Sequence, residues 1–176
     1  MAITRLRATI PLATCLVVLA LMTACSSAGR TKVAVPKSHS IPHEATSSLL
    51  VESVTKKSYQ YQIQIEQLIR KGLSTSLVNS GIFKSVSNRS TDSDYRIDAR
   101  IQRVRIRSPA ARVLFGFMAG RSYIQVQVDV RETKTDRLIT SFLTTGYGAK
   151  SMIGAQSYGY DDPVREVVAN VVHNLR

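Results

Sequence analysis

Residues 96–121 are rich in arginine, whose planar guanidinium group can bind phosphate or carboxylate through two parallel hydrogen bonds. Seven arginines fall in this range: Arg96, Arg100, Arg103, Arg105, Arg107, Arg112 and Arg121. Strand alternation places the first two on one face with Asp98 between them, and a change of phase groups Arg103, Arg105 and Arg107. This cluster is a candidate anion site, and the alternative is a solvated sheet face, the commoner meaning of a charge run.

The segment Ala110–Gly120 holds a distinctive apolar stretch, Val113-Leu-Phe-Gly-Phe-Met-Ala, between Arg112 and Arg121. Apolar loop residues can dock into a partner protein or a lipid interface, and they can equally cover the end of the protein's own sheet. The two glycines do not predict a phosphate-binding loop, because the Lys-Ser/Thr pair of such loops is missing. The candidate partner-binding residues are Arg103, Arg105, Arg107, Arg112, Phe115, Phe117, Met118 and Arg121.

The sequence contains no recognisable set of catalytic residues. No two carboxylates stand in an acid/base arrangement, and Gly154-Ala-Gln-Ser157-Tyr-Gly159 misses the spacing of a nucleophile elbow by one residue. His39 and His43 lack a helical context and His173 stands alone, so a metal site is not expected. We therefore predict a protein that is not an enzyme and has no cofactor or metal. A small hydrolase is the remaining enzymatic alternative, and it would need a pocket that joins His173 to Ser157.

The N-terminus has the pattern of a secretory signal. Arg5 and Arg7 precede a run from Ala8 to Leu21 that contains no charge. A positive region, an apolar region and small residues at the cleavage point define such signals. The run is shorter than the roughly 20 residues that a spanning helix needs, so a permanent transmembrane anchor is the weaker interpretation.

The end of this signal, Leu21-Met-Thr-Ala-Cys25, resembles the lipobox of bacterial lipoproteins. The resemblance implies that the chain is cut before Cys25, that the Cys25 thiol is acylated, and that residues 1–24 are removed. Met22 stands where the family usually has Leu, Val or Ile. Ser26, rather than Asp, follows the cysteine, which implies sorting to the outer membrane with the domain facing the periplasm. The alternative is a cleaved signal with an incidental cysteine.

Composition limits the mature chain to one domain and a narrow set of partners. Without residues 1–24, 152 of the 176 residues and a net charge of +10 out of +12 remain, enough for a single core. Cys15 leaves with the signal, so disulfides and thiol catalysis are excluded. Outside the inner membrane the basic balance does not indicate nucleic acid. It favours anionic lipid, acidic cell-wall groups or acidic proteins.

The first part of the mature chain is expected to be extended. Residues 25–46 mix Ser, Lys, Pro and small residues and predict a flexible tether, in which Val33-Ala-Val35 could pair as a short edge strand. Leu49–Val54 predicts a strand. Residues 58–79 predict a helix ended by Gly81, although Tyr59–Ile65 also alternates as a strand would.

The second part of the chain predicts a sheet closed by a helix. Residues 82–86 suggest a short strand and 95–106 a long one, with a phase slip at Gln102-Arg103 that indicates a β-bulge. Tyr123–Glu132 alternates clearly and pairs with Leu138–Thr145 as a hairpin. Asp162, followed by Pro163, is the predicted N-cap of a last helix with a valine stripe.

These elements predict an α+β fold for residues 47–176. We expect a two-layer sandwich of an antiparallel-rich sheet of four to five strands with two helices on one face, in the order β-α-β-β-β-α.

A family resemblance rests on the loop and the strand that follows it. Arg112-Val-Leu-Phe-Gly-Phe-Met-Ala-Gly-Arg-Ser122, the strand Tyr123–Arg131 and Asp136-Arg-Leu-Ile139 together resemble the domain of unknown function 4410 family of bacterial lipoproteins, over roughly residues 48–176. The family usually has Gly where Met118 stands and a Gly in the turn at Asp136-Arg137. The resemblance implies a small envelope α/β module like those of auxiliary lipoproteins in transport and secretion systems, and it implies no reaction.

The prediction for function follows from the anchor, the tether and the missing catalytic set. We expect a non-enzymatic, outer-membrane-anchored periplasmic lipoprotein that acts as an accessory or structural component of an envelope transport or secretion assembly. The alternative is a binding module for peptidoglycan or anionic lipid. It would use Arg103, Arg105 and Arg107 together with a loop in which Tyr147, Tyr158 and Tyr160 could stack on sugar rings.

Overall fold

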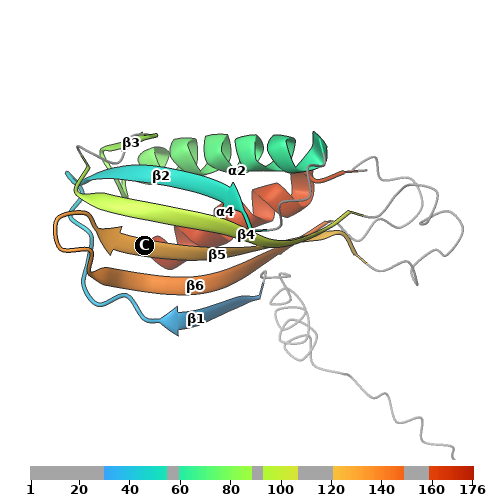
Figure 1. The fold of residues 1–176 in the computed structure, drawn as a ribbon. Coiled ribbons are helices and arrows are strands. Elements are labelled where there is room, and N and C mark those ends of the chain that lie inside the picture. The colour runs from blue at the N-terminus through green and yellow to red at the C-terminus, as the bar shows by residue number, and fades with distance from the viewer. Residues whose placement is uncertain (1–29, 55–59, 89–92, 107–120, 149–158) are drawn as a thin grey trace, which may run out of the picture.

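A six-stranded sheet with two helices on one face forms the domain (Figure 1). The structure is a computed structural model that describes residues 30–54, 60–88, 93–106, 121–148 and 159–176. The elements are, in chain order, β1 Thr31–Val35, β2 Thr46–Ser53, α2 Gln60–Asn79, β3 Ser85–Ser87, β4 Tyr95–Arg105, β5 Tyr123–Glu132, β6 Leu138–Tyr147 and α4 Asp161–Leu175.

The α+β class is confirmed, but the expected strand number and order are wrong. The sheet order is β1-β6-β5-β4-β2-β3, with β2 parallel to both β3 and β4 and the remaining neighbours antiparallel. The sheet is therefore mixed. The parallel pairs arise because α2 runs back across the sheet and returns the chain to the end at which β2 starts. β3 and β4 therefore begin at that same end.

A flexible tether was predicted for residues 25–46, but residues 31–35 of this range form β1 of the sheet. β1 pairs with β6, which confirms the edge strand at Val33–Val35, and Ile41 and Ala45 are buried in the core. The Lys37 ammonium donates hydrogen bonds to the backbone carbonyls of Leu175 and Arg176 at 3.0 and 2.9 Å. The folded domain thus begins at β1.

The core lies between the sheet and the helices. α2 contributes one residue per turn, each fully buried: Ile65, Ile69, Leu73 and Leu77. β5 contributes Ile124, Val126, Val128 and Val130, also fully buried, as its alternation predicted. Gly81, with a φ of 69°, ends α2 in the left-handed conformation that glycine adopts without steric cost.

The start of α4 differs from the prediction. The helix begins at Asp161, with Tyr160 rather than Asp162 as its N-cap and without a side-chain capping bond. Asp161 and Asp162 therefore both lie in the first turn, where a negative charge is favoured by the helix dipole. Pro163 still falls within the first turn, where its missing N–H costs nothing.

α4 rests directly on β6 at Gly146. A Cβ atom at this position would lie 2.1 Å from the Pro163 carbonyl oxygen and 2.8 Å from the Val167 nitrogen. Both are backbone atoms that cannot move without moving the helix. Gly146 is therefore required for the close approach of the two layers.

Candidate functional site

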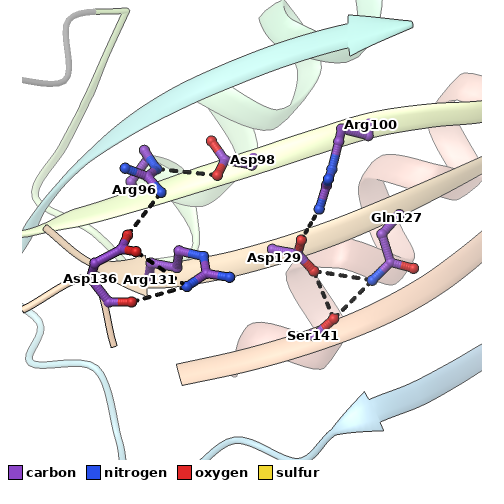
Figure 2. A network of polar contacts seen from close by, with 8 residues as sticks. All are labelled: Arg96, Asp98, Arg100, Gln127, Asp129, Arg131, Asp136 and Ser141. Atoms are coloured by element: carbon purple, nitrogen blue, oxygen red, sulfur yellow. Dashed lines mark hydrogen bonds and ion pairs between the residues drawn. The ribbon is translucent and has the colours of Figure 1, made fainter. Parts of the chain in front are cut away.

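The face of the sheet opposite α2 and α4, here called the open face, carries no helix among the described residues (Figure 1). On β4, Arg96, Asp98 and Arg100 point to this face and alternate with buried Ile97 and Ala99. The open face is polar and crosses β4, β5 and β6, as Figure 2 shows.

The half of the open face that contains the β5–β6 turn carries two neighbouring clusters of polar contacts, here together called the paired region (Figure 2). Its members are Arg96, Asp98, Arg100, Gln127, Asp129, Arg131, Asp136 and Ser141. Each carboxylate in it accepts hydrogen bonds from at least one arginine.

Asp129 is the centre of the first cluster, since both of its carboxylate oxygens are used. Oδ1 accepts hydrogen bonds from the Ser141 hydroxyl at 2.7 Å and the Gln127 amide at 3.1 Å, and Oδ2 accepts one from Arg100. Three neighbouring strands contribute these donors, so that the Asp129 residue is only 8% exposed although it lies on the open face.

The environment of Asp129 favours its ionised form. Burial by itself would raise the pKa of this carboxyl group, but the hydrogen bonds from Ser141 and Gln127 and the charge of Arg100 outweigh burial and hold the pKa below its ordinary value. Asp129 is therefore a fixed negative charge that binds the three strands together.

A second group of contacts joins β4 to the β5–β6 turn. Arg96 donates to Asp98 at 3.1 Å and to Asp136 at 3.0 Å, and Arg131 donates to the Asp136 carbonyl at 3.0 Å. Burial alone would lower the pKa of Arg96, but Asp98 and Asp136 raise it overall. Asp136 has a φ of 54°, a backbone conformation that glycine favours.

This arrangement has a limited chemistry. Asp98 and Asp129 face each other across β4 and β5, but each is bonded to an arginine. For Asp129, whose pKa lies below its ordinary value, protonation would break the contact with Arg100. The paired region is suited to fixing the strands.

The other half of the open face, here called the arginine end, has charges without partners. It consists of Arg103, Arg105, Arg121, Tyr123 and Tyr147. The bulge predicted at Gln102-Arg103 lies between Ile101 and Arg103, and beyond it Arg103 pairs in register with Gln125 and Arg105 with Tyr123. Arg103 and Arg105 are exposed, and within the described part of the chain neither forms an ion pair or a hydrogen bond.

Two tyrosines accompany these arginines. The rings of Tyr123 and Tyr147 lie side by side, with centroids 6.3 Å apart, and the Arg121 guanidinium lies 6.0 Å from the Tyr147 ring centre. The Tyr147 backbone N–H donates to the Glu166 carboxylate of α4. Exposed guanidinium groups beside aromatic rings are suited to binding an anion.

The structure brings together only some of the predicted site residues. Arg103, Arg105 and Arg121 meet at the arginine end. Six others lie outside the described residues, and their predicted roles remain predictions: Cys25, Arg107, Arg112, Phe115, Phe117 and Met118. Gln127, Asp129 and Ser141 were not predicted as a cluster, although an aspartate in the middle of a strand is uncommon and could have indicated one.

The remaining candidates do not converge. Tyr160 donates to the Gln64 side chain at 2.8 Å, while His43 contacts the Gly81 carbonyl at 2.8 Å and His39 the Ser38 hydroxyl at 3.1 Å. Ser157 and Tyr158 lie outside the described residues. Across the described ranges, no three His, Cys, Asp or Glu residues are grouped as a metal site requires. Nor does any helix described here have the length and hydropathy needed to cross a membrane.

Comparison with solved structures relates the fold to bacterial proteins of low sequence identity. PelC from Paraburkholderia phytofirmans, which forms a dodecamer, superposes with a TM-score of 0.58 at 12% identity over 84% of this chain and 96% of PelC. XCC0632 from Xanthomonas campestris, described as DUF330, gives a TM-score of 0.50 at 13% identity, over 79% of this chain and 85% of its own. At such identities the likeness concerns the fold alone.

Comparison with known sequences gives one clear match. The family model described as "Domain of unknown function (DUF4410)" matches residues 31–151, from the first residue of β1 to beyond the end of β6. No curated protein matches the chain.

Proposed function

The chain belongs to the DUF4410 family, and from that premise we propose that it is a lipoprotein anchored to the outer membrane and facing the periplasm. It serves, without catalysis of its own, as an accessory or structural component of an envelope transport or secretion assembly. The observation that carries the proposal is the position of Cys25, at the end of a lipobox-like signal and only six residues before the sheet begins at Thr31.

A role in an assembly is supported by the fold and by the open face. PelC, which shares the fold, forms a dodecamer. In this chain the arginine end presents exposed charges that no described residue neutralises. Charged surfaces of this kind select partners and accelerate association.

The absence of catalysis is supported by the paired region. Its carboxylates, the densest titratable cluster described above, are bonded to arginines and hold strands together. None is left as a free base beside a nucleophile, which an acid/base or acyl-transfer mechanism would require.

Labelling with radioactive palmitate and replacement of Cys25 by serine test the proposal. We expect the wild-type chain to incorporate palmitate and to fractionate with outer membranes, and Cys25→Ser to lose both properties. Copurification from solubilised envelopes, followed by mass spectrometry, should recover a constant set of envelope proteins with the wild-type chain. Unlabelled wild-type protein, or a serine variant with unchanged fractionation, would contradict the anchor.

A second candidate function is favoured by the unpaired Arg103 and Arg105, namely a binding module for peptidoglycan or anionic lipid. Isolated peptidoglycan should retain such a module at low salt and release it at raised salt, because exposed charges are screened within about 10 Å at 0.1 M ionic strength. An assembly component would instead come down with specific proteins.

A further inference from the structure

We propose that the arginine end of the sheet lies against the phospholipid headgroups of the leaflet that holds the lipid of Cys25, and that Arg103 and Arg105 bind anionic headgroups there. This inference rests on the anchored state in the proposed function and adds an orientation and a ligand class to it. Three observations carry it: the reach of the anchor, the end of the sheet at which it enters, and the charge of that end.

The reach of the anchor is short because β1 belongs to the domain. Five residues separate Cys25 from Thr31, and the six fully extended Cα–Cα steps between them span about 20 Å. β4 has 11 residues and is about 35 Å long at the usual rise per residue. The end of the sheet at which β1 starts is therefore held within reach of the bilayer, while the opposite end can stand a strand's length farther away.

The anchor enters at the arginine end. β1 is antiparallel to β6 and begins opposite Thr144, three residues before β6 ends at Tyr147. β5 begins at the same end with Tyr123, which pairs with Tyr147 of β6 and with Arg105 of β4. Figure 1 shows β1 starting at the end toward which the arrow of β2 points, and β2 is parallel to β4.

The charge of this end fits an anionic surface. Arg103 and Arg105 are exposed and unpaired among the described residues, and the exposed Arg30 and Lys32 add two positive charges beside them at the start of β1. At the opposite end of the face, by contrast, Arg96 and Arg131 pair with Asp98 and Asp136, and Arg137 pairs with Glu132. Among the described residues of the open face, the exposed arginines without a carboxylate partner therefore lie at the end near the anchor, whereas the opposite end keeps the exposed Lys134.

Most of the acidic groups near this end belong to α4, and the exception is the exposed Glu52 of β2. Asp162 pairs with Arg165, and Glu166 accepts a hydrogen bond from the Tyr147 backbone. Asp161 is exposed in the helical layer, away from the open face, and Glu52 lies opposite Arg100 on the neighbouring strand. Because most of these acidic groups lie on α4, we expect only the sheet side of this end to contact an anionic surface.

Headgroup phosphate matches the side chains that are present. Guanidinium groups bind phosphate oxygens in pairs, and tyrosine is enriched at membrane–water interfaces, where its ring is partly buried and its hydroxyl stays hydrated. Tyr123 and Tyr147 stand beside Arg105 and Arg121 at this end.

Paramagnetic relaxation in nanodiscs tests the orientation. Cys25 is the single cysteine of the mature chain, so isotope-labelled mature protein can be coupled through it to a maleimide lipid. The discs contain phosphatidylglycerol, phosphatidylcholine and a trace of gadolinium-headgroup lipid. We expect strong broadening of the amide signals of Arg103, Arg105 and Tyr123 and weak broadening at Lys134 and Asp136.

Charge variants test the ligand class. The double variant Arg103→Gln, Arg105→Gln should lower the ratio of docked to undocked molecules roughly 30-fold, if each basic residue contributes about 1 kcal/mol at an anionic surface. A matched control, Lys71→Gln with Lys134→Gln, removes the same charge from exposed positions outside the arginine end and should leave the broadening unchanged. Discs of phosphatidylcholine alone should behave like the double variant.

The outcomes separate this inference from the proposed function. Equal broadening at both ends, or no dependence on phosphatidylglycerol, overturns the inference even if palmitate labels Cys25. Soluble peptidoglycan fragments that shift the Arg103 and Arg105 signals while anionic discs do not would assign the arginines to the cell wall and overturn it also. A failure of palmitate labelling would overturn only the proposed acylation of Cys25. The nanodisc experiment does not depend on acylation, because it couples Cys25 to a maleimide lipid.

Discussion

The two halves of the open face use the same side chain in different ways. Along β4, Arg96 and Arg100 precede the bulge and are bonded to carboxylates, whereas Arg103 and Arg105 follow it and have no partner among the described residues. Arginine in the paired region stabilises the sheet. Beyond the bulge, Arg103 and Arg105 are exposed, and we propose that they bind a partner, so that one strand would carry both a structural and an interacting surface.

The largest effect is expected where α4 supports the arginine end from behind. Gly146→Ala would place a Cβ atom 2.1 Å from the Pro163 carbonyl oxygen, and relieving this clash should cost about 3 kcal/mol in the free energy of unfolding, measured in urea. Gly148→Ala is the matched control, because its nearest heavy atom would be 3.4 Å away. Equal losses in both variants would contradict the direct contact between α4 and β6.

The next effect should distinguish buried from exposed pairs within the paired region. Asp129→Asn would leave Arg100 and Ser141 without their carboxylate, and we expect a loss of about 2 kcal/mol in unfolding free energy. Asp136→Asn keeps a residue that tolerates the positive φ and changes an exposed ion pair, which should cost under about 1 kcal/mol. If the second variant were the less stable one, Asp129 would not be the centre of its cluster.

A smaller effect should appear as a difference in acid stability. The lowered pKa of Asp129 means that the unfolded chain takes up a proton more readily than the folded one. The stabilisation is therefore complete above the unfolded pKa of about 3.9 and is lost as the pH falls through it toward the folded value. Wild-type protein should lose stability over this range, and Asp129→Asn should lose less of it.

The acid comparison has an internal reference. Asp94, whose pKa is lowered mainly by the hydrogen bonds from Thr46, is present in both proteins, so the difference between their unfolding curves isolates Asp129. Parallel curves from pH 6 to pH 3 would show that Asp129 titrates alike in the folded and unfolded chains.

The smallest effect on stability is expected at the arginine end. Arg103→Gln combined with Arg105→Gln should change the free energy of unfolding by less than about 0.5 kcal/mol, the usual range for exposed positions without partners. Urea denaturation of the double variant and of Asp129→Asn under the same conditions compares the two losses of stability directly. A loss as large as that of Asp129→Asn would show that these arginines stabilise the fold and would remove the distinction between the two regions.

Local patterns in the sequence were sufficient to predict most of the individual helices and strands. The stripe that includes Ile65, Ile69 and Leu77 identified α2, Gly81 marked its end, and the phase slip at Gln102-Arg103 predicted the bulge. Each of these depends on neighbours within one or two turns of chain, which a single sequence displays directly.

Long-range pairing could not be predicted in the same way. β1 is only five residues long, and its partner β6, which supplies its hydrogen bonds, lies more than 100 residues later in the chain. The Asp129 cluster likewise depends on the register of three strands, which brings Arg100 and Ser141 to one carboxylate. The start of α4 was predicted two residues too late, because Asp162 followed by Pro163 has the pattern of a helix start, whereas the N-cap is Tyr160.

The direction of β1 also determines how the domain would bear mechanical load. A pull from the bilayer would reach Thr31 along the axis of the strand, toward the end at which β1 begins. Such a force shears the ladder with β6, so that its hydrogen bonds resist together instead of opening one after another. The Lys37 ammonium, which donates hydrogen bonds to the backbone carbonyls of Leu175 and Arg176, would pass part of this force to the C-terminus of α4.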